Sequence, residues 1–211
     1  MSNAPLRPIR LYTHPLSGHG HRVALFLSLL GLPHETVVVD LLRKEQKSPE
    51  FLRLNPFGQV PVIDDDGEII ADSNAILVYL ATKYDGGAYL PRDPVGAAAV
   101  QRWLSVAAGM IASGPASARR ALLFKMPQDV EQPQKIANDL FAVMDAHLAG
   151  RSFLVGSTPT IADIAGYSYI AKAPEGGIAL TPYPHLLAWL ERIEALPGFV
   201  AMPSNKIGLW A

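Results

Sequence analysis

The sequence predicts an α/β domain followed by an all-helical one. Up to residue 86, short apolar or β-branched runs alternate with segments of helical periodicity. Residues 85–94 (DGGAYLPRDP) hold two glycines and two prolines, which is typical of a linker. No strand pattern follows. We therefore predict an α/β domain over residues 1–86, a linker over 87–94 and a helical bundle over 95–211.

Local patterns predict the first three elements. Residues 9–12 (IRLY) alternate between the two faces of a strand. Residues 18–30 carry apolar side chains at helical spacing and end before Gly31, which predicts a helix. The run at 36–39 (TVVV) is continuous and β-branched, so we expect a strand that is buried on both faces.

A short helix, a hairpin and a longer helix complete the first domain. Ser48 and Pro49 suit the cap and the first position of the short helix. Residues 60–63 (VPVI) and 68–70 (EII) flank DDDG, which predicts two strands joined by a tight turn. Asp72 caps the last helix. The β-α-β start implies a parallel pair and the hairpin an antiparallel edge, so we expect a mixed four-stranded sheet.

The second domain is predicted from helical periodicity alone. Four helices are expected, over residues 95–113, 133–148, 160–171 and 185–196. The first of them carries apolar residues on more than one face, which favours a contact with a second chain. These residues are Val100, Trp103, Leu104, Ala107, Ala108 and Ile111. The alternative is that this helix is wholly buried in its own bundle.

Composition and charge exclude several classes of protein. The 211 residues include 18 basic and 19 acidic ones, a balance that argues against a nucleic-acid or anionic-membrane partner. There is no cysteine, so disulfides, thiolate nucleophiles and cysteine-ligated metals are excluded. The N-terminal segment shows no apolar signal core, and runs such as residues 23–30 fall far short of the ~20 residues that span a bilayer. We expect a cytoplasmic protein.

The loop between the first strand and the first helix is a candidate anion site. Ligands collect at the carboxyl ends of strands in open α/β sheets, and the N–H groups of the following helix point into this loop. The hydroxyl of Ser17 could donate there to a thiolate or a phosphate. The alternative is that Ser17 is only a helix cap.

The same loop also holds a Gly-x-Gly pair and three histidines. The glycine pair resembles part of a dinucleotide fingerprint, but valine stands at its third glycine position. His14, His19 and His21 have no carboxylate or further histidine at ligand spacing, so hydrogen-bonded or solvated histidines are the simpler interpretation. We expect no metal.

Two further segments suit a ligand with peptide and charged groups. Pro61 lies just inside a predicted strand, where it removes a ladder donor. If the Val60–Pro61 bond is cis, the N–H and C=O of Val60 can pair with an extended peptide; an ordinary trans proline is the alternative. Ser73 at a helix start suits a carboxylate and Asp72 suits an ammonium, as in an α-amino acid. Plain capping is the alternative for both.

Together these segments resemble the cytosolic glutathione S-transferase family. NPFGQVP at 55–61 followed by DSNAI at 72–76 is specific in combination, and the similarity extends to SGHGHRV at 17–23 and TIADI at 160–164. It covers essentially the whole chain, and the loop serine resembles serine-type, zeta- or theta-like members. The resemblance implies a thioredoxin-like first domain, a helical second domain, a homodimer and a cis Val60–Pro61 bond.

The resemblance also implies roles for individual residues. Ser17 corresponds to the hydroxyl that activates the glutathione thiol, but the Gly-His-Gly after it departs from the family pattern, so a histidine or backbone N–H groups remain alternatives. Val60 corresponds to the residue that pairs with the cysteinyl group. Thr160 and Asp163 resemble a buried structural capping box. The other residues implied to bind glutathione are Gln59, Gln46 or Lys44, Pro61, Asp72 and Ser73.

The implied activity is glutathione transfer, as in detoxification. The protein would stabilise the glutathione thiolate for attack on a small, largely apolar electrophile. We expect that second substrate between the loop after the first strand and the helix that carries Trp103, Met110 and Ser113, where Met110 is either adaptable lining or plain core. The alternatives are a glutathione-dependent reductase of disulfides or peroxides and a non-catalytic binding or scaffold protein. The sequence does not identify the second substrate.

Overall fold

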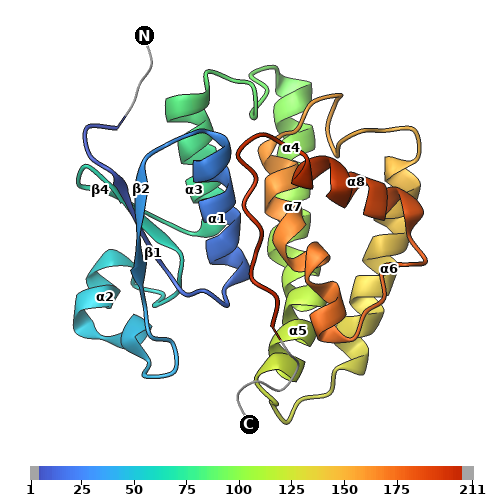
Figure 1. Cartoon of the computed structure of the whole chain (residues 1–211), viewed down its shortest axis with the longest axis horizontal. Coiled ribbons are helices and arrows are strands. Elements are labelled where there is room, and N and C mark those ends of the chain that lie inside the picture. Colours follow the sequence, from blue (N-terminus) through green and yellow to red (C-terminus); the bar gives the residue numbers. More distant parts are fainter. Residues whose placement is uncertain (1–4, 206–211) are drawn as a thin grey trace.

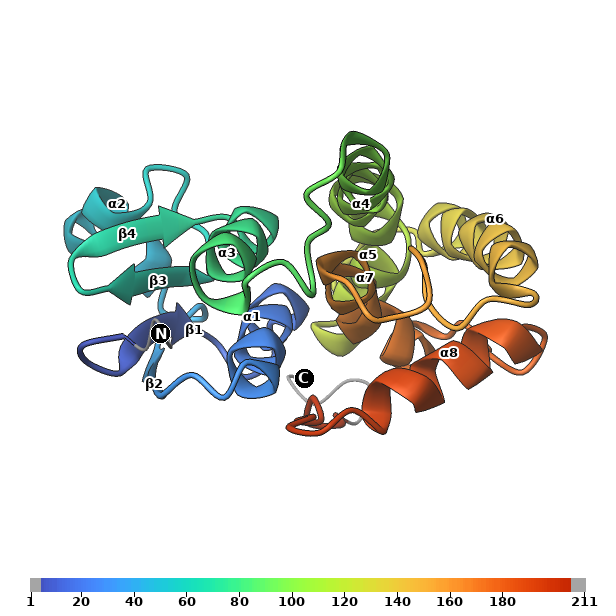
Figure 2. The ribbon, with the colours of Figure 1, turned by 90° about the horizontal axis from the view of Figure 1, so that it is seen from above.

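One mixed four-stranded sheet organises the first half of the chain in a computed structural model, which describes residues 5–205. The strand order is β2–β1–β3–β4 (Figures 1 and 2). The strands are β1 (Ile9–Thr13), β2 (His34–Val38), β3 (Val62–Asp65) and β4 (Glu68–Ala71). β1 pairs in parallel with β2 and antiparallel with β3, which pairs antiparallel with β4. The predicted mixed sheet, with its thioredoxin-like arrangement, is confirmed.

Helices pack on the two faces of this sheet. They are α1 (Gly18–Leu29), α2 (Pro49–Leu54) and α3 (Ser73–Leu80), with 3-10 turn Glu45–Lys47 before α2 and π-helical turn Ala81–Asp85 after α3. α1 and α3 lie between the sheet and the helical half (Figure 1) and cover Ile9 and Leu11, which are fully buried. Phe51 of α2 packs against Val62 in a separate small cluster. Because helices cover the faces of the sheet, the loops that follow its strands, rather than a sheet face, are left to meet the helical half.

β2 differs from the prediction. It lies at the edge of the sheet, all five of its residues are exposed or half-buried, and Val38 exposes 57% of its surface. The expectation of a strand buried on both faces was wrong, because β-branched side chains favour the extended backbone whether or not anything covers them. The buried valine of this run is Val39, just beyond the strand.

The predicted short-helix cap and hairpin turn are present. The Oγ atom of Ser48 accepts a hydrogen bond from the N–H of Phe51 over 3.2 Å. In the hairpin turn, Asp66 and Gly67 have positive φ angles of 55° and 96°, the left-handed conformation that a tight two-residue turn requires. Oδ1 of Asp64 accepts from the N–H of Gly67 over 2.8 Å. DDDG therefore joins two strands, as its spacing predicts.

Five helices form the second half, and no strand follows β4 within the described residues. They are α4 (Pro94–Val106), α5 (Pro115–Leu123), α6 (Glu131–Leu148), α7 (Ile161–Ala171) and α8 (Pro184–Glu194), with π-helical turn Ala107–Ile111 before α5 and 3-10 turn Ala173–Gly176 after α7. α7 lies at the centre, packed against α1 and α4 (Figure 2). α5 was not predicted, because Gly114 and Pro115 are helix breakers in most positions; here Pro115 opens α5, where its missing N–H costs nothing.

The capping box at the start of α7 is confirmed. The Thr160 side chain accepts from the N–H of Ala162, and Oδ2 of Asp163 accepts from the N–H of Thr160 over 2.8 Å. Oδ1 of Asp163 accepts from the indole N–H of Trp189 over 2.9 Å and from the N–H of Leu154 over 2.8 Å. Asp163 is fully buried, so these bonds tie α7, α8 and the preceding loop together.

The apolar faces of α4 do not support the argument for a second chain. Five of the six residues behind that argument are buried within this chain, and only Ala108 is exposed. The helix belongs to its own bundle, which was the alternative. The continuous helical run Pro94–Leu123 is long and apolar enough to cross a membrane, a test that a core helix also passes, so one such run is weak evidence for a span.

Candidate functional site

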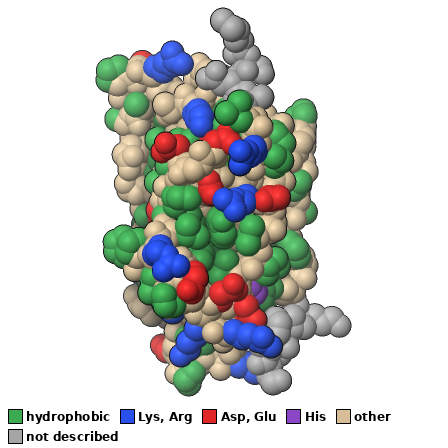
Figure 3. Space-filling model, turned by 90° about the vertical axis from the view of Figure 1, so that its left-hand side faces the viewer, with side chains coloured by type: hydrophobic (Ala, Val, Ile, Leu, Met, Phe, Trp, Pro, Cys, Tyr) green, Lys and Arg blue, Asp and Glu red, His purple; other side chains and the backbone are tan. Residues whose placement is uncertain are grey.

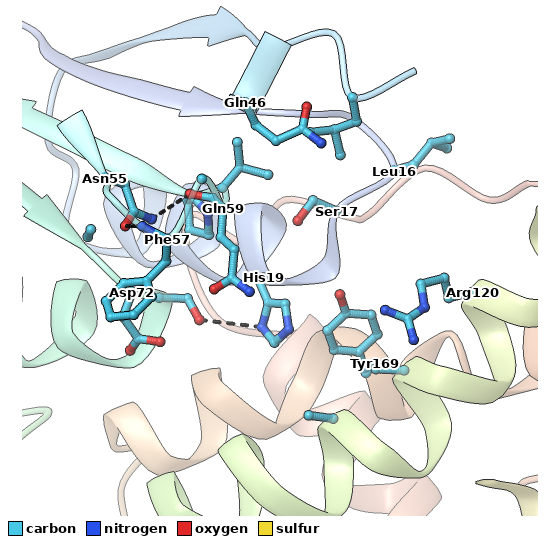
Figure 4. Close-up of a pocket in the computed structure, with 18 of the residues that line it drawn as sticks. Leu16, Ser17, His19, Gln46, Asn55, Phe57, Gln59, Asp72, Arg120 and Tyr169 are labelled. Atoms are coloured by element: carbon cyan, nitrogen blue, oxygen red, sulfur yellow. Dashed lines mark hydrogen bonds between the residues drawn. The ribbon is translucent and has the colours of Figure 1, made fainter. Parts of the chain in front are cut away.

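A cavity of about 820 Å³ lies where the loops of the sheet meet the helical half (Figure 4). Cavities that hold small organic ligands measure roughly 300–1,000 Å³. From the first half, its lining includes Leu16, Ser17, His19, Gln46, Asn55, Phe57, Gln59, Val60, Pro61, Asp72 and Ser73. From the helical half, it includes Ala112, Ala116, Ser117, Arg119, Arg120, Phe124 and Tyr169. Every first-half residue implied to bind glutathione, except Lys44, therefore lines one cavity.

Ser17 is both a helix cap and a cavity residue. Its Oγ atom accepts from the N–H of Gly20 over 3.0 Å at the start of α1. A hydroxyl that accepts one bond still has its proton to donate. Figure 4 shows the Ser17 hydroxyl directed into the space between the two halves. The capping role and the donor role, which the sequence left as alternatives, are therefore compatible.

Asp72 leaves one carboxylate oxygen free at the cavity. Its Oδ1 atom accepts from the N–H groups of Asn74 and Ala75, over 2.9 and 3.0 Å, whereas Oδ2 has no partner among the described residues. Asp72 also has a φ of 72°, which is strained for a residue with a side chain. Strain of this kind is typical of functional sites. The free oxygen suits a cationic group of a ligand.

The hydroxyl of Ser73 is oriented by a buried arginine. Nη1 of Arg22 donates to Oγ of Ser73 over 2.8 Å, and Oγ also lies 3.4 Å from Nδ1 of His19. Burial lowers the pKa of Arg22 to about 10 and that of His19 to about 3, so at neutral pH the arginine is charged and the histidine neutral. Arg22 can only donate, so the Ser73 proton points away from it, either to Nδ1 of His19 or to an acceptor in the cavity.

The segment before β3 presents main-chain groups to the cavity. The Val60–Pro61 peptide bond is cis, as the resemblance implies. The backbone N–H and C=O of Val60 make no hydrogen bond to another described residue. Nδ2 of Asn55 donates to the carbonyl oxygen of Gln59 over 2.8 Å and fixes the neighbouring peptide. Val60 can therefore pair with an extended ligand.

Gln46 and Lys44 were alternatives for one carboxylate, and the structure separates them. Gln46 lines the cavity, and its Oε1 atom is buried with no hydrogen-bond partner in the part of the chain that the structure describes. Lys44 is exposed and does not line the cavity. Gln59 lines it as well, with its side chain directed inward in Figure 4.

The expected second-substrate wall is not where the sequence placed it. Trp103, Met110 and Ser113 do not line the cavity: Trp103 is buried with its ring 5.1 Å from that of His147, and the other two are exposed. The helical run continues through α5, so Ala112, Ala116 and the arginines that follow recur at helical spacing on the face toward the sheet. Extending the periodicity past Pro115 would have found this wall.

Tyr169 is a cavity residue that sequence reasoning missed. Burial raises the pKa of its hydroxyl, and the backbone at Gly18 and His19 opposes that rise. A Cβ atom on Gly18 would lie 2.7 Å from the Tyr169 ring, so glycine is needed for this approach. Of the N–H groups at Gly18 to Gly20, an expected alternative for thiol activation, that of Gly20 is engaged by Oγ of Ser17. No local pattern predicts a contact between α1 and α7.

The three loop histidines have structural partners. Nδ1 of His14 accepts from the N–H of Leu16 over 3.2 Å. The ring of His21 bridges Oγ of Ser168 and the carbonyl oxygen of Val200, both over 2.9 Å. Within residues 5–205, no three histidine or acidic side chains gather as a metal site would require.

Comparisons with known proteins cover both halves of the chain. The family model for the glutathione S-transferase N-terminal domain matches residues 16–83, and that for the C-terminal domain matches residues 107–197. Glutathione S-transferase 3 from Zea mays is 36% identical over 208 residues, which cover 92% of each chain. The disulfide-bond oxidoreductase YfcG from Escherichia coli is 32% identical, covering 90% of this chain and 91% of that one.

A solved structure shows the same architecture. The crystal structure of a glutathione transferase homolog from Drosophila mojavensis, with bound glutathione, has a TM-score of 0.82 against this chain. The two are 31% identical, and the match covers 90% of this chain and 89% of the other.

Proposed function

Because this chain belongs to the glutathione S-transferase family of enzymes, we propose that its cavity binds glutathione and activates the thiol for transfer to a second substrate. The γ-glutamyl ammonium would meet the free oxygen of Asp72, and its carboxylate the hydroxyl of Ser73. The cysteinyl peptide would pair with Val60. Gln46 and Gln59 would hold the glycyl carboxylate.

Activation of glutathione requires that the protein lower the pKa of its thiol. A free thiol of pKa ~8.5 is only a few per cent ionised at neutral pH, and lowering that pKa by about two units requires ~2.7 kcal/mol of differential stabilisation. The Ser17 proton, the positive end of α1 and the Tyr169 hydroxyl converge on the same part of the cavity (Figure 4). Hydrogen bonds to a thiolate together with a helix N-terminus are of the right magnitude.

One observation carries the proposal. Among residues 5–205, Oδ2 of Asp72 and the backbone groups of Val60 lack partners. The Ser73 proton can turn to the cavity, and all three residues line the same space as Ser17. A scaffold that bound nothing would not require these polar groups in one cavity. Titration calorimetry with glutathione tests the proposal, alongside turnover of chlorodinitrobenzene followed by absorbance. Binding and turnover support a transferase; binding without turnover leaves a binding protein; neither leaves the scaffold.

A reductase is the second candidate, because a 32% identical relative is a disulfide-bond oxidoreductase. This chain has no cysteine, so the glutathione thiol would have to attack the disulfide itself. Assaying the same preparation with a glutathione mixed disulfide and with chlorodinitrobenzene compares the two reactions. Faster turnover of the disulfide, corrected for the uncatalysed rate, would favour the reductase.

A homodimer fits the proposed function. Phe57, which lines the cavity, exposes 79% of its surface. Hydrophobic side chains also gather at the centre of the sheet-side face in Figure 3. Exposed patches of this kind are common at interfaces. Light scattering should give twice the 22.8 kDa chain mass, and Phe57→Ser should lower it. A monomer that still binds glutathione would contradict the dimer.

Cytoplasmic location and a role in detoxification remain predictions from the sequence.

A further inference from the structure

Two adjacent arginines of α5 line the helical wall of the cavity. Arg119 and Arg120 are both cavity residues, on the side opposite the proposed glutathione ligands. Arg120 is exposed and makes no hydrogen bond or ion pair with another described residue. In Figure 4 its guanidinium extends toward Tyr169 rather than away from the cavity. A free guanidinium at this position is available to a ligand.

Arg119 supplies a second, independent observation. Its side chain is 3% exposed; Nε donates to Glu175 over 2.7 Å and Nη1 donates to the carbonyl oxygen of Leu16 over 2.9 Å. Nη2 is buried and has no hydrogen-bond partner in the described part of the chain. Arg119 therefore adds a fixed positive charge to this wall, next to the exposed guanidinium of Arg120.

The local charge is positive. Glu175 is shared between Arg119 and Lys172, whose Nζ lies 4.0 Å from the carboxylate. Asp72 is the sole acidic residue among those that line the cavity, and Figure 4 places it at the far side from Arg120. Nothing in the cavity wall neutralises the Arg120 charge.

From this arrangement we propose that the second substrate carries an anionic group of the carboxylate class, bound by Arg120, with the buried charge of Arg119 beside it adding to the positive potential of this wall. The inference rests on the proposed function and deepens it. Arginine matches a carboxylate with two parallel N–H donors. Ala112, Ala116 and Phe124 line the same wall and would contact the apolar remainder of the substrate. The expected electrophile is therefore amphipathic rather than largely apolar.

A matched pair of electrophiles tests the proposal. Chlorodinitrobenzoate and its methyl ester differ by one charge. In both, the thiolate sulfur bonds to the ring carbon that bears chlorine, and chloride leaves with the electron pair of the broken bond. Comparing the acid-to-ester ratio of kcat/KM between enzyme variants cancels the difference in intrinsic reactivity.

Arg120→Gln should lower the acid-to-ester ratio about fivefold, the effect of one partly exposed charge pair. Arg120→Lys, which keeps the charge but loses the paired donors, should lower it less. Raising the salt concentration should lower the ratio in the unmodified protein but not in Arg120→Gln. The matched control is Arg7→Gln, because Arg7 is exposed, has no hydrogen-bond or ion-pair partner among the described residues and lies outside the cavity lining. This variant should leave the ratio unchanged.

Each other outcome overturns the proposal. An unchanged ratio in Arg120→Gln would show that Arg120 does not contact the anionic group. If calorimetry instead shows weaker glutathione binding in Arg120→Gln, with the ratio unchanged, the arginine serves glutathione. If the unmodified protein neither binds glutathione nor converts either electrophile, the proposed function fails and this inference fails with it.

Discussion

The guanidinium of Arg22 donates to the hydroxyl of Ser73 over 2.8 Å, across 51 residues of sequence. The same Nη1 atom donates to Oδ1 of Asn74 over 2.8 Å, so α1 holds the first turn of α3 at two points. Arg22 is 1% exposed. Because Arg22 can only donate, the Ser73 proton turns away from it, toward His19 or toward a carboxylate in the cavity.

A double-mutant cycle tests this link. Arg22→Met and Ser73→Ala should each weaken glutathione binding and lower the free energy of unfolding, measured by calorimetry and by urea denaturation. Their effects should not add, because both remove one charge-assisted hydrogen bond worth about 1.5–3 kcal/mol. Additivity to within about 0.5 kcal/mol would show that the two residues act independently.

Asp72→Asn separates the charge of Asp72 from its capping role. Asparagine caps helices as well as aspartate does and tolerates a positive φ, so the melting temperature should change little. Glutathione affinity should fall by about 1.5–3 kcal/mol, because the ligand ammonium loses its partner. The matched control is Asp93→Asn, since Asp93 caps α4 in the same way and lies outside the cavity lining. Equal affinity in both variants would contradict the assignment.

Buried histidines make the stability fall in mild acid. Burial lowers the pKa of His21 to about 4 and that of His19 to about 3, against ~6.5 in the unfolded chain. Below pH ~6.5 the unfolded chain binds protons that the folded chain does not. As the pH is lowered, the free energy of unfolding therefore decreases by up to about 1.4 kcal/mol per pH unit for each histidine. Above that pH both stay neutral and contribute no slope.

Urea denaturation at a series of pH values measures this slope. His21→Gln should reduce it by one histidine's share, because glutamine cannot titrate but can still form hydrogen bonds to Ser168 and the Val200 carbonyl. An unchanged slope in His21→Gln would show that His21 is not the group that takes up the proton.

The sequence predicts whatever is encoded locally. The caps at Ser17, Ser48 and Asp72 and the DDDG turn depend on neighbouring residues, and all are present. The cavity residues of the first half could be named from the sequence because their order along the chain resembles a family pattern. Exposure of β2 was not predictable, since the same β-branched residues suit an edge strand and a central one.

The helical wall of the cavity escaped prediction for a physical reason. Tyr169 contacts α1 only because α7 packs on α1. The residues around Gly18 give no sign of this contact. The local sequence around Arg119 and Arg120 predicts an ordinary pair of solvated arginines. Only the tertiary structure shows that α5 lies beside the loop that contains Leu16. Contacts between the two halves depend on the tertiary structure, which local periodicity does not encode.

The most direct test of the account is the pKa of the thiol in bound glutathione. Ultraviolet absorbance of the thiolate, titrated against pH in the complex, reports it. We expect a pKa about two units below the ~8.5 of a free thiol, and a rise toward the free value in Ser17→Ala. Ser48→Ala, which removes a cap that does not line the cavity, should leave it unchanged. A bound thiol that titrates like the free one, or a Ser17→Ala complex with an unaltered pKa, would contradict the account.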